Sequence, residues 1–243
     1  MQCMMTLLFV SVRYKLLKPR CPNLAKATVV LLAIGVLSLG CEVSLAGAGP
    51  IPDTSRAAKS SVQSFLKEAL NQIVVGKPEE ALLQVERAMK LDANSAEAYF
   101  LRGRAKHDIG LKSEALSDYN RAIQIQPRYP KALVNRALIK AGLGDIKASL
   151  KDLDAAILID PQMATAYSNR GVARGALGDK KGALADFTKA IALNQNFADA
   201  YRNRGISLEL LGDLKGACAD WKKAAALGQQ DIRGWLLQQC SQK

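Results

Sequence analysis

Side chains suited to acid–base, nucleophilic or metal chemistry are scarce in this chain. His107 is its single histidine, and neither a second histidine nor a cysteine stands at metal-ligand spacing from it. The sequence also has no glycine-rich phosphate-binding loop. We therefore expect no catalytic, cofactor-binding or metal-binding residues, and we predict that the protein is not an enzyme.

Charged residues form the most conspicuous regular pattern. Arginine and aspartate each recur every 34 residues, as Arg102, Arg136, Arg170 and Arg204 and as Asp118, Asp152, Asp186 and Asp220. One interpretation is a basic ridge that binds a ligand. The other is a row of ion pairs, because every arginine has the same local relation to a carboxylate of its own or the preceding unit. We favour the ion pairs, which at about 0 to 1 kcal/mol each when exposed would fix register more than add stability.

Apolar and small residues repeat at the same interval. The units run without insertion over 62–95, 96–129, 130–163, 164–197 and 198–231. The fourth position of each unit is large, the eighth is small and the fifteenth is glycine: Phe65, Tyr99, Leu133, Tyr167 and Tyr201; Ala69, Gly103, Ala137, Gly171 and Gly205; Gly76, Gly110, Gly144, Gly178 and Gly212. Small residues let two helices approach closely, and glycine ends the first helix. Each unit is therefore predicted to be a helix-turn-helix.

This pattern resembles the tetratricopeptide repeat family over residues 62–231. The resemblance implies an all-α, right-handed solenoid of five helix-turn-helix units, in which the first helices line a concave groove that holds an extended peptide or a partner helix. Residues 232–243 follow the last unit, and their apolar start, from Ile232 to Cys240, predicts a capping helix and a short tail.

Asparagine occupies the sixth position of three units. In the family's carboxylate-clamp members an asparagine there helps to grip a peptide's C-terminal carboxylate. The rest of that clamp is replaced here, by Val134 and Leu138, and Lys131 lies in the unit before Asn169 rather than after it. We therefore do not expect a carboxylate clamp, but retain as candidate peptide-binding residues Asn135, Asn169, Asn203, Arg104, Lys131 and Arg202.

The remaining groove positions are small and apolar, with basic residues at their edges. Val134, Leu138 and Ala141 represent them in the third unit. Such a lining suits a protein or peptide partner with apolar anchors and some acidic character, although small residues there could equally serve tight curvature of the solenoid. The net charge is +12. Because both signs are interleaved along the repeats, we expect no nucleic-acid partner.

Residues 1–48 have the features of an export signal or a membrane anchor. The uncharged segment 27–41 is shorter than the roughly 20 residues of a comfortable membrane span, and Ala46-Gly47-Ala48 resembles a cleavage site. We predict cleavage after Ala48, followed by a linker at 49–61. The alternatives are an uncleaved anchor and a lipoprotein acylated at Cys41. Each interpretation exports the repeats to the periplasm or another extracytoplasmic lumen, with membrane contact only through an uncleaved or lipidated leader.

Cleavage would leave Cys218 and Cys240 as the only cysteine pair. The turn between their helices is expected near Gly228-Gln229, so equal rise along both helices brings the two cysteines to the same level. We predict a disulfide that pins the capping helix, the alternative being two buried free thiols.

The favoured function is a non-catalytic scaffold or adaptor that binds a peptide or partner protein in the concave groove, for example during assembly of an envelope or membrane complex. The alternatives are a regulatory docking subunit of an enzyme complex and a structural solenoid that self-associates. Repeat folds specify a binding geometry rather than a ligand, so the partner's identity is open.

Overall fold

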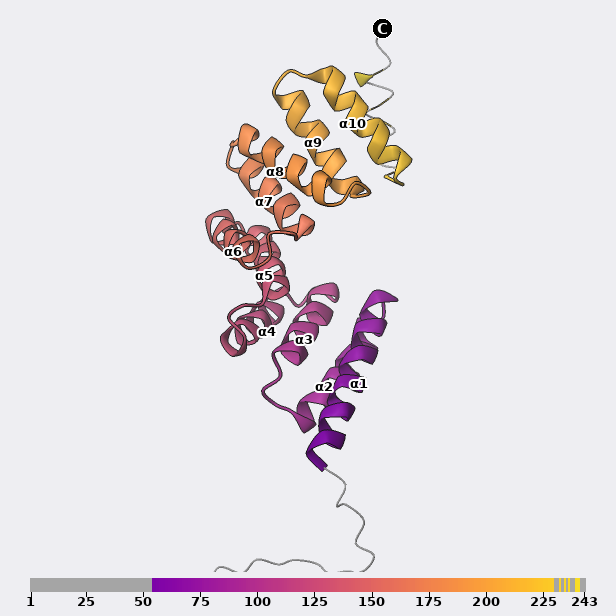
Figure 1. Cartoon of the computed structure of the whole chain (residues 1–243), viewed down its shortest axis with the longest axis vertical. Helices are drawn as coiled ribbons and strands as arrows, with labels where there is room; N and C mark the ends of the chain where they lie inside the picture. Colours follow the sequence, from indigo (N-terminus) through magenta and orange to yellow (C-terminus); the bar gives the residue numbers. More distant parts are fainter. Residues whose placement is uncertain (1–53, 230–231, 233, 235, 237–238, 241–243) are drawn as a thin grey trace, which may run out of the picture. The chain divides into compact units, whose positions relative to one another are not determined.

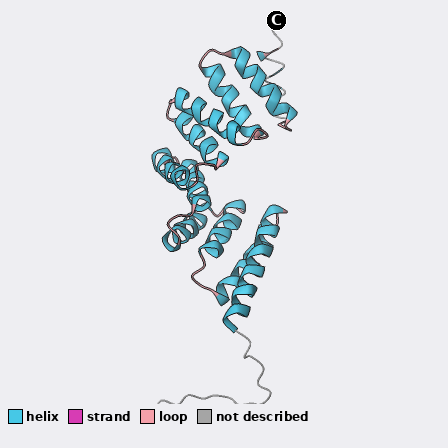
Figure 2. Ribbon diagram, viewed as in Figure 1, coloured by secondary structure: helices cyan, strands magenta, loops and turns pink. Residues whose placement is uncertain are grey.

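The structure is a computed structural model that describes residues 54–229 together with 232, 234, 236, 239 and 240. The predicted leader at 1–48, its cleavage site and Cys41 lie outside the described residues. Within those residues every regular element is an α-helix, and Figure 2 shows helices joined by short loops with no strand. No helix in this part is long and apolar enough to cross a membrane.

Between residues 54 and 229, ten helices form five consecutive hairpins. Their bounds are α1 Thr54–Val74, α2 Pro78–Leu91, α3 Ala96–Asp108, α4 Lys112–Ile125, α5 Pro130–Gly142, α6 Ile146–Ile159, α7 Ala164–Ala176, α8 Lys180–Leu193, α9 Ala198–Leu210 and α10 Leu214–Ala226. Each odd-numbered helix packs most closely on the even-numbered helix that follows it, and each hairpin packs on the next in chain order (Figure 1). The predicted all-α repeat solenoid is confirmed for the described chain.

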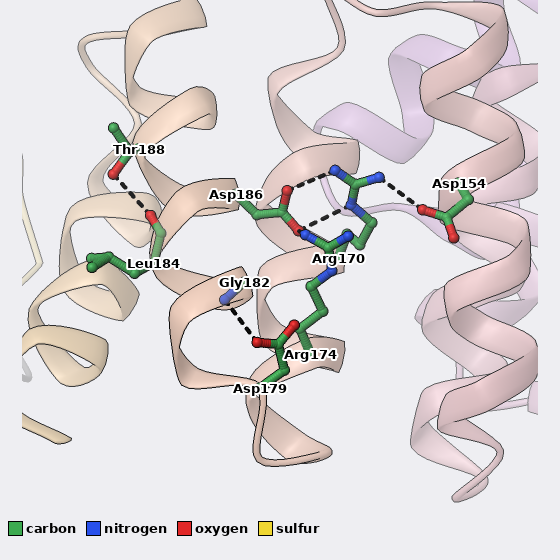
Figure 3. Close-up of polar contacts among 8 residues, drawn as sticks. All are labelled: Asp154, Arg170, Arg174, Asp179, Gly182, Leu184, Asp186 and Thr188. Atoms are coloured by element: carbon green, nitrogen blue, oxygen red, sulfur yellow. Dashed lines mark hydrogen bonds and ion pairs between the residues drawn. The ribbon is translucent and has the colours of Figure 1, made fainter. Parts of the chain in front are cut away.

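Glycine makes the turn within each hairpin possible. Gly178 has a φ of +84°, in the left-handed region that side chains with a Cβ rarely adopt. The reversal lets the N–H of Asp179 donate to the carbonyl of Arg174 at 3.0 Å, which satisfies a free carbonyl at the end of α7. The Asp179 carboxylate then accepts from the N–H of Gly182 at 2.8 Å and caps α8, as Figure 3 shows.

Close contact between the two helices of a hairpin depends on the small residue at the eighth position. An added Cβ at Gly171 in α7 would lie 2.8 Å from the ring of Phe187 in α8. At Gly103 in α3 it would lie 2.9 Å from the ring of Tyr119 in α4. The large residues of the second helices, including Tyr119 and Trp221, are in consequence almost completely buried.

The first helix begins earlier than the sequence pattern predicts. The expected linker at 49–61 differs from the structure from Thr54 onward, because α1 already includes residues 54–61. That segment has neither glycine nor proline to stop a helix. The repeat pattern starts only where α1 meets the core, at the buried Val62, so the periodicity could not reveal the additional helical turns.

The described residues after α10 include three, Ile232, Leu236 and Cys240, that pack on the last hairpin and are called the returning segment. Ile232 is buried against a cluster that includes Trp221 and Ala224. The N–H of Leu236 donates to the carbonyl of Ile232 at 3.0 Å, and the N–H of Cys240 donates to the carbonyl of Leu236 at 3.1 Å. These bonds have the spacing of an α-helix, and the apolar contact covers the end of the repeat core.

Candidate peptide-binding groove

The arginine and aspartate ladder forms ion pairs. Arg170 donates from Nε and Nη2 to the carboxylate of Asp186 at 3.0 and 2.7 Å, and from Nη1 to Asp154 of the preceding hairpin at 2.7 Å (Figure 3). The same bidentate bond to the aspartate of its own hairpin is made by Arg102, Arg136 and Arg204. The hydrogen bonds to Asp186 raise the pKa of Arg170 above its ordinary value. The favoured ion-pair interpretation is confirmed, because guanidiniums engaged in this way do not form a free basic ridge.

A second cation joins three of these aspartates. The side chains of Lys106, Lys140 and Arg174 lie 2.8 to 3.0 Å from the carboxylates of Asp118, Asp152 and Asp186 respectively. These cations stand at the eleventh position of consecutive units, so the 34-residue repeat carried the signal. Two positive groups on one nearly buried carboxylate balance the desolvation of that charge.

A hollow of about 360 Å³ opens on the first helices, between α3 and α5 with the start of α7 beside it. Its polar lining residues are Arg104, His107, Asp108, Tyr119, Lys131, Asn135 and Thr165. Three of the six predicted peptide-binding residues, Arg104, Lys131 and Asn135, therefore converge on one site.

An aromatic cluster accounts for the position of this hollow. The ring of Phe100 in α3 lies 5.1 Å from the ring of Tyr129, which precedes α5, and 6.0 Å from the ring of Tyr119. Helices α3 and α5 also approach each other less than the other consecutive first helices do. Large rings between two hairpins hold their first helices apart, which leaves space on the groove side.

A second, smaller hollow of about 190 Å³ lies between α7 and α9. Val172, Ile206 and Leu210 give it an apolar lining, and Gly175 leaves room beside them. Asn203 is the predicted residue found here. Asn169 and Arg202 line neither hollow, and both are half-buried. The carbonyl of Arg202 accepts a hydrogen bond from the Trp221 indole at 3.3 Å.

Tyr119 is a groove residue that sequence analysis missed. It stands at the twenty-fourth position, which the pattern assigns to the core, and its side chain is fully buried. The side chain nevertheless lines the hollow between α3 and α5, and its hydroxyl has no hydrogen-bond partner of good geometry among the described residues. Burial raises the pKa of this phenol, and Asp108 adds to the effect, while Arg104 and Asn135 act in the opposite direction. The sequence feature that distinguishes Tyr119 is its hydroxyl, because none of the equivalent residues of the other units has one. These residues are Val85, Leu153, Phe187 and Trp221.

Cys218 and Cys240 are joined by a disulfide, with their Cα atoms 5.8 Å apart. The bond links α10 to the returning segment that carries Ile232 and therefore holds the cap on the last hairpin. No group of three or more histidine, cysteine or acidic side chains in the described residues is arranged to hold a metal ion.

Comparisons with known proteins agree with this architecture. Sequence profiles of the tetratricopeptide repeat match residues 66–130, 130–163 and 169–232. A comparison with curated proteins finds no match.

Three similar solved structures are between 18% and 22% identical in sequence, which makes them evidence of the fold alone. A thermophilic repeat protein of Thermus thermophilus, TTC0263, has a TM-score of 0.62 at 22% identity, over 74% of this chain and 98% of its own. PilF of Pseudomonas aeruginosa has a TM-score of 0.69 at 18% identity, over 74% and 82%. YrrB, described as a protein with an unusual peptide-binding site, has a TM-score of 0.56 at 18% identity, over 75% and 98%. Since the profiles match more than half of its residues, the chain belongs to the tetratricopeptide repeat family.

Proposed function

We propose that this protein is a non-catalytic interaction scaffold that holds an extended segment of a partner protein along its first helices, from the hollow between α3 and α5 to the hollow between α7 and α9. The observation that carries the proposal is that both hollows lie on first helices and that together they include Arg104, Lys131, Asn135 and Asn203. A protein-binding role is general in this family, and the described peptide-binding site of YrrB supports it.

The exposed side chains of the first helices along the groove indicate the partner's chemistry. Leu138 and Val172 occupy the same position in consecutive first helices and are 41% and 51% exposed. Exposed apolar side chains in register suit the apolar anchors of an extended segment. Arg104 and Lys131 supply positive charge at the α3–α5 end. The partner is therefore a segment with apolar anchors and some acidic character.

The proposed location is extracytoplasmic, as the leader-like sequence suggests. The Cys218–Cys240 disulfide supports an oxidising compartment, because structural disulfides persist there. An exported scaffold of this kind fits assembly of an envelope or membrane complex. Self-association by end-to-end stacking is less well supported, since the returning segment with the buried Ile232 covers the end of the last hairpin.

The test is partner capture in the native host, by crosslinking followed by mass spectrometry. The double variant Leu138→Asp/Val172→Asp places two charges in the groove at exposed positions, so the fold should tolerate it. Leu158→Asp is the matched control, because Leu158 lies on α6, a second helix, and is 85% exposed. We expect the double variant to lose the crosslinked partner and the control to retain it. Undiminished capture by the double variant would move the binding site away from the groove.

A further inference from the structure

Tyr119 lines the hollow between two first helices although it belongs to a second helix. It belongs to α4, a second helix, and its ring passes Gly103 of α3 so closely that an added Cβ there would lie 2.9 Å away. Because Gly103 has no side chain, the Tyr119 ring has room to lie between α3 and α4. The Tyr119 side chain lines the hollow between α3 and α5, although the residue is fully buried and its hydroxyl is a buried atom.

The hydroxyl differs from the equivalent groups in the other hairpins. Val85, Leu153 and Phe187 have no polar atom at this position, and the indole of Trp221 donates to the carbonyl of Arg202. The Tyr119 hydroxyl makes no hydrogen bond of good geometry among the described residues, although Asn135 lies near enough to act on its pKa. Native proteins rarely leave a buried polar atom without a well-formed hydrogen bond, so one on a side chain that lines an open hollow points to a ligand atom that completes it.

The charges around the hydroxyl indicate which ligand atom that is. Arg104 and Lys131 line the hollow, and neither makes an ion pair or hydrogen bond within the described part of the chain. The ladder arginines, in contrast, are each held by a carboxylate. Asp108 is the acidic residue in the lining and is exposed. Two permanent cations against one carboxylate leave the hollow positive.

We infer that the hollow between α3 and α5 is a subsite for the carboxylate of a glutamate or aspartate side chain in the bound partner, with the Tyr119 hydroxyl donating from its floor and Arg104 and Lys131 binding from its walls. The inference rests on the proposed function, because it names one contact of the segment held in the groove. A carboxylate accepts hydrogen bonds only, and it therefore matches a phenol and two cations that can all donate.

A side chain fits this place better than a chain terminus does. First helices continue on both sides of the hollow, with α1 before α3 and with α7 and α9 after α5. An extended segment can therefore pass through the site and leave it in both directions. The floor of the hollow is then reached by a side chain that branches from that segment.

Three synthetic peptides and the full chain test the inference. The first peptide is acetylated and amidated, with one central glutamate among alanine and leucine. The second replaces the glutamate with glutamine, and the third is the glutamine peptide with a free C-terminal carboxylate. Dissociation constants are measured by calorimetry at low ionic strength for the wild type, Tyr119→Phe and Tyr129→Phe. Tyr129 is the matched control, because it loses the same atom from the same aromatic cluster but does not line the hollow.

We expect the glutamate peptide to bind the wild type on the order of tenfold more tightly than either glutamine peptide. Tyr119→Phe should remove most of that preference, and Tyr129→Phe should retain it. Equal binding of the glutamate peptide and the blocked glutamine peptide, or the same behaviour in the two variants, would overturn the subsite. So would tight binding of the free-terminus peptide, since it would assign the hollow to a terminal carboxylate.

The two proposals can fail separately. If Leu138→Asp/Val172→Asp abolishes partner capture while glutamate and glutamine peptides bind equally, the groove function stands and the carboxylate subsite is wrong. If that double variant captures the partner as well as the wild type does, the groove function is wrong whatever the peptides show.

Discussion

The guanidinium of Arg170 joins two hairpins, because it donates to Asp186 of its own hairpin and, at 2.7 Å, to Asp154 of the preceding one. Arg136 makes the corresponding link to Asn120 at 2.9 Å. The ladder therefore has two different parts. The bond within a hairpin is buried and repeated without change, whereas the bond between hairpins is more exposed and varies in its acceptor.

The first prediction is that the bond within a hairpin contributes more to stability than the bond between hairpins. The side chain of Asp186 is 4% exposed and that of Asp154 is 59% exposed. Asp186→Ala leaves Arg170 and Arg174 without their shared carboxylate and should lower the free energy of unfolding by about 3 kcal/mol. Asp154→Ala should lower it by less than about 1 kcal/mol. Urea denaturation measures both, and equal losses would contradict the division.

The second prediction concerns helix approach. Gly171→Ala adds a methyl group 2.8 Å from the ring of Phe187, in a contact that has no free space, and should destabilise the protein by about 1 to 3 kcal/mol. Gly142→Ala is the control, because a Cβ there meets nothing within 4 Å. Alanine is the better helix former, so this change should be neutral or stabilising by up to about 1 kcal/mol. Thermal unfolding of the two variants provides the comparison, and a destabilised Gly142→Ala would contradict it.

The repeating features of this molecule could be predicted from its sequence, because each is specified within one unit. The glycine at Gly178 and the small residue at Gly171 determine a turn and a helix contact regardless of the neighbouring units. The groove depends instead on how far consecutive hairpins separate. That spacing between α3 and α5 follows from Phe100 and Tyr129, whose rings do not recur together at the equivalent positions of the other units. The pattern alone therefore could not show that Asn135 would line a hollow and Asn169 would not.

Tyr119 shows a second limit. Its position is a core position in the repeat, and the ring does pack as core. The position pattern describes where the ring is, but not where the atom at its end lies. Only the three-dimensional arrangement of α3, α4 and α5 shows that this core side chain also lines a hollow of the groove.

The third prediction concerns the cap. The disulfide closes a loop between residues 22 apart in the sequence, for which chain entropy predicts about 3 kcal/mol of stabilisation. Cys240→Ser should therefore accelerate hydrogen exchange in α10 and the returning segment while leaving α3 and α5 unchanged. Hydrogen exchange followed by mass spectrometry resolves these segments. A reducing agent should reproduce the effect in the wild type and add nothing in the variant, and unchanged protection of α10 would contradict the pinning role.

The last prediction uses the stability of Tyr119→Phe. Removing a buried hydroxyl that makes no hydrogen bond of good geometry takes away its desolvation cost, so the variant should be more stable than the wild type at neutral pH, by about 1 kcal/mol. Burial, with Asp108, raises the pKa of Tyr119 above its ordinary value of 10.0. The folded state thus favours the neutral phenol, and this contribution is complete below pH 10.0 and is lost as the pH rises toward the folded pKa. Melting temperatures measured from neutral pH upward should fall less steeply for Tyr119→Phe above pH 10.0.

Tyr129→Phe is the control. It should also make the alkaline fall in melting temperature less steep, because burial raises the pKa of Tyr129. Its hydroxyl is not among the unpaired buried atoms of the described residues, so its loss should not raise stability at neutral pH. A Tyr119→Phe variant less stable than the wild type at neutral pH would mean that the hydroxyl already has a partner within the protein, which would remove the basis for assigning it to a ligand.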